Sequence, residues 1–555
     1  FVISRGRLDE LVPIENARMK DRTVIQWEKD DIDELGMMKV DVLGLGMLSA
    51  IRRAFDLLKH DYGETFTLAD IPSEDPCVYA MLQNADSIGV FQVESRAQQS
   101  MLPRLKPKTF YDLVIEVAIV RPGPIQGDMV HPYLRRREGK DPIEYPSPEL
   151  EAVLGKTLGV PLFQEQAMQI AIIGANFTPD EADELRRSLA TFRHVNTISS
   201  LRERFLEGMS KNNYPKEFAD RCFSQIEGFG TYGFPEAHAI SFANLVYVSA
   251  WLKHHYPDVF CAALLNSQPM GFYAPAQLVR DAREHGVEVR PIDVNHSYWE
   301  TTLEPIENSS RHAVRLGMHM VSGLFEKEAQ ALVEKRNDGY RTPSEIARRA
   351  GCGRRALDRL AQADAFASMT MGRREALWKT SVFDKKIPPL FVTADLFDDP
   401  KADLPPTTDS QEVLADYLAT GLTLRAHPLT FLRPRLKARR VTTAAELKKV
   451  PVDKTVLVAG LVLFRQHPQT AKETIFVTIE DETGAANLIV WKHVHTKCHA
   501  AVYHGKLLAC RGVVQREGQV LHVVPRDVWD WSGLLKQLDS QNGAPALPVR
   551  SRDFR

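Results

Sequence analysis

The stretch Met38-Lys39-Val40-Asp41-Val42-Leu43-Gly44-Leu45 places one carboxylate, Asp41, in a run of apolar residues. Its alternation predicts a strand with Lys39 and Asp41 on one face and Val40 and Val42 on the other. A lysine and an aspartate that share a strand face near a chain bend suit a site for a metal ion and a phosphate. For this stretch by itself, a structural salt bridge or a solvent-facing edge strand is the simpler explanation, because short motifs often occur by chance.

The composition is ordinary for a soluble protein of several domains. The 555 residues exceed what one hydrophobic core supports, with 44% hydrophobic and 26% charged residues. A net charge of -2 does not by itself indicate nucleic-acid binding, although large nucleic-acid enzymes often balance a basic channel with acidic outer surfaces. We find no run of about 18 apolar residues that would span a membrane.

The cysteines and the first residues bear on the cellular compartment and on the extent of the chain. The six cysteines are scattered and form no Cys-x-x-Cys pair, so neither a zinc site nor a disulfide framework is indicated, which fits a reducing cytoplasm. The opening Phe1-Val2-Ile3-Ser4-Arg5 has no signal peptide and no initiator methionine. We therefore expect a fragment whose upstream part is missing.

Four zones follow one another along the chain. Residues 1–50 alternate and predict short strands, whereas the zone up to about Pro291 is mostly helical. Thr178-Pro179-Asp180-Glu181 is a capping box that predicts a helix start. Glycines and prolines at residues 121–124 and 228–235 predict loops or sharp turns.

The third and fourth zones have the composition of small nucleic-acid-binding modules. Val321-Ser322-Gly323-Leu324, followed by residues 326–335, resembles a helix-hairpin-helix unit, and a second unit is expected across residues 352–366. A surface linker is expected at residues 385–409. Five short strands between about Val450 and Trp531, with a glycine-marked bend, predict an OB barrel, and residues 545–555 are expected to be loose. The predicted fold class is therefore multidomain α+β.

Several polar residues have both a structural and a functional interpretation. Arg186 and Arg187 could lie on a solvated helix face, with Asp183 pairing to Arg187, or grip a triphosphate. His238, after a glycine-rich loop, is either structural or a donor beside a phosphate at a helix start. Residues 91–96 and 163–168 place polar groups in apolar stretches, where they stiffen a fold or line a polar cleft.

Candidate DNA contacts lie in the last two zones. Hairpin turns of helix-hairpin-helix units hold phosphates through backbone N–H groups, and an OB barrel commonly stacks bases on aromatic residues in a basic groove. Basic runs at residues 135–140 and 433–440 are more often solvated faces. The candidates are Gly323, Arg354 and Arg355 in the hairpin zone and Phe464, Arg465, His467, Phe476 and Trp491 in the barrel, where Phe476 could instead fill the interior.

Taken together, these motifs make the chain resemble the C-terminal part of a bacterial C-family DNA polymerase, the type that includes the replicative alpha subunit. The resemblance covers almost the whole chain. It is carried by residues 39–45, 91–96, 121–124, 164–166, 185–187 and 232–238. Three stretches, residues 23–33, 470–484 and 550–555, are most similar to the error-prone, damage-tolerant branch. Replicative members usually carry a further C-terminal domain after the barrel, and this sequence stops soon after it, so we expect the accessory branch.

The resemblance implies an architecture. Residues 1–50 would be the C-terminal part of a palm of β-nucleotidyltransferase type, and residues 51–291 the fingers. Residues 292–440 would form the helix-hairpin-helix and clamp-proximal region with its linker, residues 441–535 the OB barrel and residues 536–555 a tail.

The resemblance also implies a catalytic set. Asp41 matches the third palm carboxylate that holds catalytic Mg²⁺, and Lys39 matches a residue near the incoming triphosphate. Arg186 and Arg187 match finger residues that grip the triphosphate, while Arg121 and His238 lie in motifs that line the same pocket. The other two metal-binding aspartates are expected upstream, so this chain alone is predicted to be inactive.

The implied partners are primer-template DNA, deoxynucleoside triphosphates and a sliding clamp, bound directly or through accessory translesion proteins. Thr393-Ala394-Asp395-Leu396-Phe397 lies where replicative relatives carry a clamp-binding pentapeptide, and Leu396 and Phe397 could fill an apolar clamp pocket. Two alternatives remain at this point, a replicative alpha subunit and a non-catalytic DNA-binding subunit. An intact Asp-x-Asp pair in the upstream gene would exclude the second.

Overall fold

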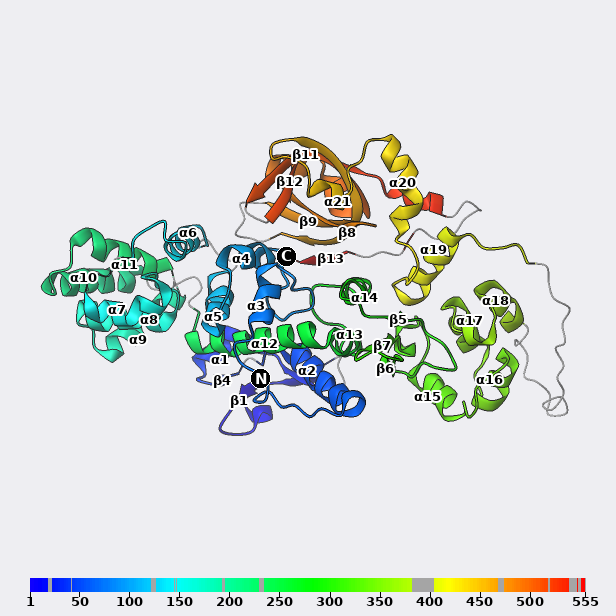
Figure 1. The fold of residues 1–555 in the computed structure, drawn as a ribbon. Coiled ribbons are helices and arrows are strands. Elements are labelled where there is room, and N and C mark those ends of the chain that lie inside the picture. Colours follow the sequence, from blue (N-terminus) through cyan, green and yellow to red (C-terminus); the bar gives the residue numbers. More distant parts are fainter. Residues whose placement is uncertain are drawn as a thin grey trace.

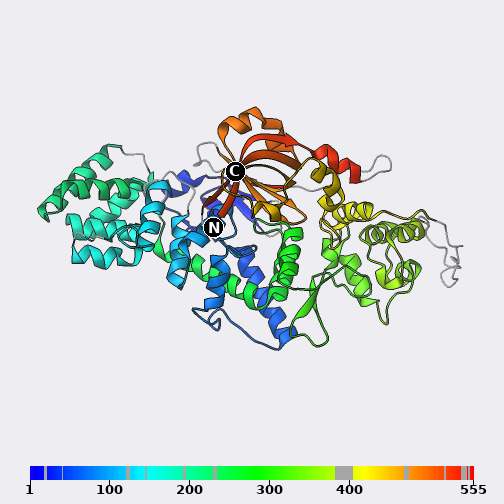
Figure 2. The ribbon, with the colours of Figure 1, turned by 45° about the horizontal axis from the view of Figure 1, so that its top comes forward.

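The computed structural model describes residues 1–17, 22–40, 42–120, 126–143, 145, 147–191, 195–228, 234–381, 404–467, 474–517, 520–538, 547 and 551–554. The molecule is elongated. Helices α7 to α11 lie at one end, helices α15 to α18 at the other, and the C-terminal barrel lies over the central helices (Figure 1). Figure 2 shows the same arrangement from a second direction.

The N-terminal zone consists of very short strands. β1 (Val2–Ile3) pairs antiparallel with β4 (Met38–Lys39), and β2 (Ile14–Asn16) with β3 (Thr23–Ile25). Helix α1 (Lys29–Glu34) lies between them, and α2 (Leu45–Leu57) begins inside the zone expected to be strands. The strand predicted around Asp41 ends at Lys39, and Asp41 itself lies outside the described residues.

The next zone is helical, as predicted. Its α-helices are α3 (Pro76–Gln83), α4 (Arg96–Leu105), α5 (Phe110–Ile119), α6 (Gln126–Arg137), α7 (Pro148–Leu154), α8 (Gln164–Gln169), α9 (Pro179–Thr191), α10 (Val195–Lys211), α11 (Lys216–Gly228), α12 (Glu236–His255), α13 (Pro257–Asn266) and α14 (Pro275–Glu284). The predicted capping box at the start of α9 is confirmed, because Thr178 N–H donates to Glu181 Oε2 at 2.7 Å and Glu181 N–H to Thr178 Oγ1 at 3.2 Å. Helix α12 is buried over most of its second half, which fits its position against α5 and α13 in the centre of the core.

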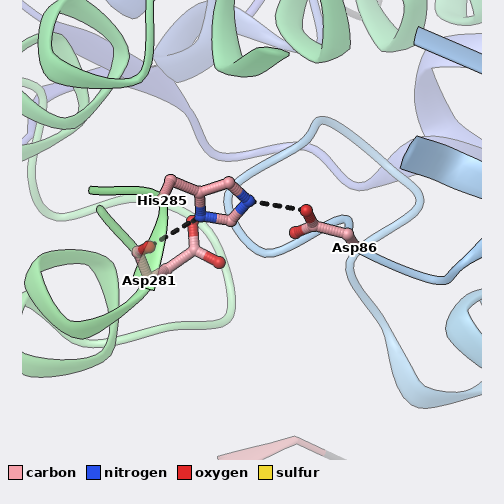
Figure 3. Close-up of side chains that lie close together, drawn as sticks. All are labelled: Asp86, Asp281 and His285. Carbon is pink, nitrogen blue, oxygen red and sulfur yellow. Dashed lines mark hydrogen bonds and ion pairs between the residues drawn. The ribbon is translucent and has the colours of Figure 1, made fainter. Parts of the chain in front are cut away.

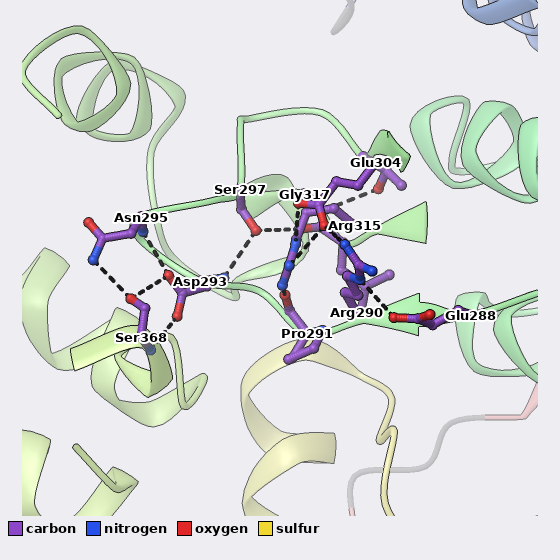
Figure 4. Close-up of polar contacts among 12 residues, drawn as sticks. Glu288, Arg290, Pro291, Asp293, Asn295, Ser297, Glu304, Arg315, Gly317 and Ser368 are labelled. Atoms are coloured by element: carbon purple, nitrogen blue, oxygen red, sulfur yellow. Dashed lines mark hydrogen bonds and ion pairs between the residues drawn. The ribbon is translucent and has the colours of Figure 1, made fainter. Parts of the chain in front are cut away.

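A small sheet connects this core to the helix-hairpin-helix region. Strands β5 (Val289–Arg290), β7 (His312–Arg315) and β6 (Thr302–Pro305) form the sheet in that order, followed by α15 (Glu326–Glu334), α16 (Pro343–Ala350), α17 (Arg354–Gln362) and α18 (Arg373–Thr380). The buried Asp293 carboxylate accepts hydrogen bonds from Ser368 N–H at 2.8 Å and from Ser368 Oγ at 2.7 Å (Figure 4). On the sheet, Glu304 pairs with Arg290 at 2.6 Å and with Arg315 at 2.8 Å. The Asp293 bonds link the hairpin region to the segment after β5, whereas the Glu304 pairs join strands of the sheet.

The C-terminal zone is a closed barrel of the predicted type. Helices α19 (Asp409–Thr420), α20 (Pro428–Ala438) and α21 (Ala444–Leu447) lead into strands β8 (Thr455–Gln466), β9 (Ile475–Asp481), β10 (Gly484–Val490), β11 (Leu507–Glu517) and β12 (Val520–Asp530). The order is β11-β12-β10-β9-β8, and β11 also pairs with β8, which closes the barrel. Helices α22 (Lys492–Lys497) and α23 (His499–His504) lie between β10 and β11.

One glycine and the chain end refine the prediction for the barrel. A Cβ atom at Gly460 would lie 2.8 Å from the backbone N and O of Glu480, so only glycine permits the close approach of β8 to β9 here. The expectation of a loose C-terminal end is wrong for its last described residues. Strand β13 (Arg552–Phe554) pairs in parallel with β8, because backbone groups of β8 beyond its pairing with β11 are available for a further strand.

The barrel is attached to the helical core through helix α14. Arg280 of α14 pairs with Glu480 of β9 at 2.5 Å and donates to the Asp481 carbonyl at 3.2 Å. The rings of Tyr273 and Phe464 meet edge to face with centroids 5.8 Å apart. Within the described ranges, no helix is both long and apolar enough to cross a membrane.

Candidate functional site

Motifs that are far apart in the sequence converge on helix α12, which carries His238. Gly44 follows the Asp41 stretch with φ of 73°, and a Cβ there would lie 3.2 Å from Leu245 Cδ1 and 3.4 Å from Phe91 Cζ. The left-handed backbone and the lack of a side chain let this segment lie directly against α12 and the Phe91 motif. From Phe91, ring contacts run along α12. The Phe91 and Phe242 centroids are 5.1 Å apart, and those of Phe242 and His238 are 4.2 Å apart.

The segment around Gln164 reaches the same place. Glu165 Oε2 accepts a hydrogen bond from the backbone N–H of Glu236 at 2.9 Å, at the first residue of α12. Gln164 N–H donates to the Phe234 carbonyl at 3.2 Å. The Tyr111 hydroxyl donates to the side chain of Glu236, at Oε1, at 2.7 Å. The structure thus brings three predicted motifs, around residues 39–45, 91–96 and 163–168, to the helix that carries His238.

His238 itself is packed between two rings. Its imidazole lies 5.0 Å from the Phe234 centroid and 4.2 Å from that of Phe242. Burial lowers the pKa of His238, so the neutral imidazole predominates near pH 7. A neutral imidazole has one N–H donor and one acceptor nitrogen, which suits hydrogen bonding to a ligand better than charge pairing.

The predicted triphosphate-gripping residues are only partly described. Arg186 on α9 pairs with Asp183 at 2.8 Å, one helical turn earlier. The expected pairing of Asp183 with Arg187 falls on a side chain outside those described, and the pairing with Arg186 is at i,i+3. Arg121 and Asp41 lie outside the described residues, and Lys39 lies on the exposed strand β4.

Other polar residues of these motifs have a structural role. Gln166 is buried, accepts from Leu162 N–H at 2.8 Å and donates to Thr157 Oγ1 at 2.9 Å. Glu94 is buried and accepts the backbone N–H groups of Gly89 and Phe272 at 3.1 and 2.8 Å. They are the buried hydrogen-bonding groups that one of the two sequence interpretations expected.

The hairpin candidates include two arginines, each paired with a carboxylate. Gly323 has φ of 80°, and Arg355 donates to its carbonyl. The Arg355 guanidinium also lies 4.1 Å from the Phe325 ring centroid and pairs with Glu328 at 2.5 Å. Arg354 pairs with Asp358 at 3.4 Å. Both arginines remain partly exposed, so their charge is accessible at the hairpin.

Two of the predicted barrel contacts need correction. Phe464 is 1% exposed and packs against Tyr273, and Arg465 is 7% exposed. The Arg465 guanidinium donates to the Val502 and Gly505 carbonyls and to Ser551 Oγ, which ties the chain end to the barrel. Their burial leaves no side-chain surface on which a base could stack, so we withdraw both as DNA contacts.

The remaining barrel candidates differ in exposure. Trp491 is 45% exposed, whereas Phe476 is half-buried. His467 lies near His495, with ring centroids 6.3 Å apart. Trp491 is therefore the barrel aromatic best placed to stack a base. Leu396 and Phe397, the predicted clamp contacts, lie outside the described residues, as does most of the expected linker.

A cluster of titratable side chains that sequence reasoning missed lies beside α14. His285 Nε2 is 2.6 Å from Asp86, and its Nδ1 is 3.8 Å from Asp281 (Figure 3). These are metal-ligating residue types, but the fully buried Lys253 ammonium lies 2.7 Å from Asp86 and 2.9 Å from Asp281 and supplies the cation. We therefore interpret the cluster as a structural ion-pair group.

In this cluster, the pKa values of His285 and Asp86 depend on each other. The hydrogen bond to Asp86 raises the pKa of His285 to about 9, against the opposing effect of burial. Burial alone would raise the pKa of Asp86, but hydrogen bonds and charge from His285 and Lys253 outweigh it and hold that pKa at about 2. His285 is thus positively charged at neutral pH.

Comparisons with known proteins place these parts in one class. Residues 1–44 match the model of the bacterial DNA polymerase III alpha NTPase domain, and residues 47–213 that of the bacterial DNA polymerase III alpha subunit finger domain. Residues 286–376 match a helix-hairpin-helix motif. The chain thus matches domains of the bacterial DNA polymerase III alpha subunit, which confirms the predicted resemblance to that family and the predicted fold class of helical fingers, hairpin region and C-terminal barrel.

Curated relatives point to one branch of this family. The chain is 53% identical over 563 residues to error-prone DNA polymerase 2 of Rhizobium meliloti (strain 1021), covering 100% of the chain and 52% of that protein. It is 54% identical over 563 residues to error-prone DNA polymerase 1 of Agrobacterium fabrum, covering 99% and 52%. It is 53% identical over 586 residues to the error-prone DNA polymerase of Caulobacter vibrioides, covering 100% and 54%. The chain spans about half the length of the curated relatives it matches.

Proposed function

We propose that the chain acts in an error-prone DNA polymerase that adds deoxynucleotides to a primer 3′-hydroxyl during synthesis across damaged template. The observation that carries the proposal is the convergence of three separate motifs on helix α12, which carries His238, in a chain whose whole length resembles polymerases of that name. The contacts that bring these motifs to α12 are apolar at Gly44 and Phe91 and polar at Glu165.

The proposed roles follow the chemistry of each side chain. Arg186 and Arg187 would grip the triphosphate, since guanidinium groups bind phosphate oxygens bidentately. Lys39 and Arg121 would add positive charge beside it. His238, neutral near pH 7, would hydrogen-bond the nucleotide from the start of α12.

Asp41 is the proposed metal-holding residue. Its carboxylate is the oxygen donor that Mg²⁺ prefers, and one carboxylate does not hold two such ions without further acidic partners. Mg²⁺ bound there would supply charge neutralisation on the transferring phosphoryl group. By itself, the 555-residue chain is therefore proposed not to extend primers.

Template and primer would be held further along the chain. The Gly323 hairpin with Arg354 and Arg355 would bind phosphates without reading sequence, and Trp491 would stack an unpaired template base. We also propose that Leu396 and Phe397 bind a sliding clamp, directly or with an accessory protein. A pull-down of the clamp with Leu396→Ala/Phe397→Ala against the parent tests this, and equal capture would argue against it.

Asp41→Ala, placed in a chain of the relatives' full length, tests the catalytic proposal. Primer extension should fall by at least about 1,000-fold, since the metal site would be lost, while primer-template binding stays unchanged. Asp56→Ala, which removes an exposed carboxylate on α2, is the matched control and should extend normally. Extension by Asp41→Ala at the control's rate would refute the assignment and favour a non-catalytic DNA-binding role.

A further inference from the structure

A cavity of about 510 Å³ lies between the helical core and the barrel. The core contributes the turn after α3 and the first turn of α4. The barrel side contributes α21 and residues of β10, β11 and β12. Its polar lining consists of Asn84, Arg96, Gln99, Lys448, Asn487 and Arg516. None of the residues proposed above for catalysis or triphosphate binding is among those that line it.

The cavity is cationic. Arg96, Lys448 and Arg516 line it, and no aspartate or glutamate does. Arg96 donates to Gln99 Oε1 at 2.7 Å and has no carboxylate partner among the described residues. Burial lowers the pKa of its guanidinium, which reflects the cost of holding this charge without a counter-ion.

The Arg516 guanidinium is bound to the backbone at Lys448. Arg516, on β11, donates to the backbone carbonyl of Lys448, just after α21, at 2.5 Å. Both side chains are exposed and therefore accessible to a ligand from solvent. Positive charge from β11, from the residue after α21 and from α4 thus lines one cavity, where an anion would be attracted to it.

The other walls suit a flat apolar group. Ala85, Ala444, Ala485 and Ala486 line the cavity with small side chains. The carboxamides of Asn84, Gln99 and Asn487 add hydrogen-bonding groups beside them. A volume of about 510 Å³ is within the range of small-ligand sites and accommodates a nucleotide.

We propose that this cavity binds a phosphate-bearing ligand of nucleotide size, with the phosphate on Arg96, Lys448 and Arg516 and the base against the alanine wall. The phosphate could come from a free nucleotide or from the backbone of a single strand. Because the cavity joins the core to the barrel, an occupied site would also hold the barrel in place. The proposal does not depend on the polymerase activity.

Binding measurements on the 555-residue chain test the proposal. The probes are deoxyadenosine monophosphate, followed by calorimetry, and a fluorescein-labelled twelve-residue oligothymidylate, followed by anisotropy. Lys448→Glu/Arg516→Glu should raise the Kd of the bound probe by at least about tenfold. Lys449→Glu/Arg511→Glu reverses two exposed charges outside the cavity, one next to Lys448 and one on the same strand as Arg516, and should change the Kd less than about twofold.

The outcomes separate the sources of phosphate. Binding of the monophosphate alone indicates a free nucleotide, and binding of the oligonucleotide alone indicates a single strand. Arg186→Ala should leave either interaction intact, which distinguishes this cavity from the proposed triphosphate site. The proposal is overturned if the parent binds neither probe, if both double variants bind equally, or if Arg186→Ala abolishes binding. Should Lys448→Glu/Arg516→Glu unfold, Lys448→Gln/Arg516→Gln provides the same comparison.

Discussion

The barrel and the N-terminal zone are both built on β-strands, yet they bury apolar side chains to opposite extents. In the barrel, Leu508 and Val523 are fully buried on strands of eleven residues each. In the N-terminal zone, strands of two or three residues leave Phe1, Met38 and Leu43 between 57% and 79% exposed. A closed sheet satisfies its own edges and core, whereas short open strands with exposed apolar residues gain stability only when another surface covers them.

The largest expected effect lies inside the barrel. Leu508→Ala removes a side chain with no exposed surface and leaves a cavity, so the barrel should lose about 3 kcal/mol of stability. Hydrogen exchange of the amides in β8 to β12 measures this directly. Exchange as slow as in the parent would show that the barrel core is not what stabilises this part of the chain.

The next effect tests whether the barrel also depends on the helical core. Arg280→Ala leaves the buried Glu480 carboxylate without its nearest cation, with His427 at 3.7 Å as the remaining partner. We expect a loss of about 2 kcal/mol, because the Arg280 side chain is itself 27% exposed, and faster proteolysis between the barrel and α14. Arg283→Ala, on the same helix, is the control, because Arg283 contacts a backbone carbonyl rather than a buried acid. Equal effects of the two changes would contradict a specific role for Arg280.

The stability of the region around α14 should depend on pH, because His285 lies directly after this helix, which also carries the barrel contact Arg280. Hydrogen bonding to Asp86 raises the pKa of His285 from 6.5 to about 9 in the fold. Its stabilising contribution is therefore complete below pH 6.5 and is lost as the pH rises through about 9.

Urea unfolding of the parent and of His285→Gln at a series of pH values measures this contribution. The parent should be more stable by about 1 to 3 kcal/mol at pH 6.5, and the difference should shrink by pH 9.5. A difference that stays constant across this range would mean that protonated His285 does not stabilise the cluster.

The smallest expected effect is in the N-terminal zone. Leu43→Ala makes the same chemical change as Leu508→Ala, but at a side chain that is 57% exposed. Its cost should be less than about 0.5 kcal/mol, since little buried area is lost. Thermal unfolding of the two variants side by side completes the comparison, and a large loss at Leu43 would show that the zone has a core of its own.

A feature was predictable from the sequence when its interacting groups lie close together along the chain, and was missed when they lie far apart. The capping box at Thr178 was predictable because its partners lie three residues apart. The barrel strands were predictable from alternation and from the glycine at position 460. Arg465 was misassigned to the surface because its partner Ser551 lies 86 residues away on a segment expected to be loose. The cluster of Asp86 and His285, 199 residues apart, had no local signal at all.

The sequence by itself determined the helical zone, the hairpin unit, the barrel and the family resemblance, because these follow from short-range patterns of apolar residues, caps and glycines. Only the tertiary structure decided which polar residues are buried and which face a ligand. It placed Gly44 against Phe91 and α12, packed Phe464 onto Tyr273, and brought Arg96 opposite Lys448 and Arg516. The physical reason is that burial and charge pairing depend on contacts between distant segments, which no local pattern specifies.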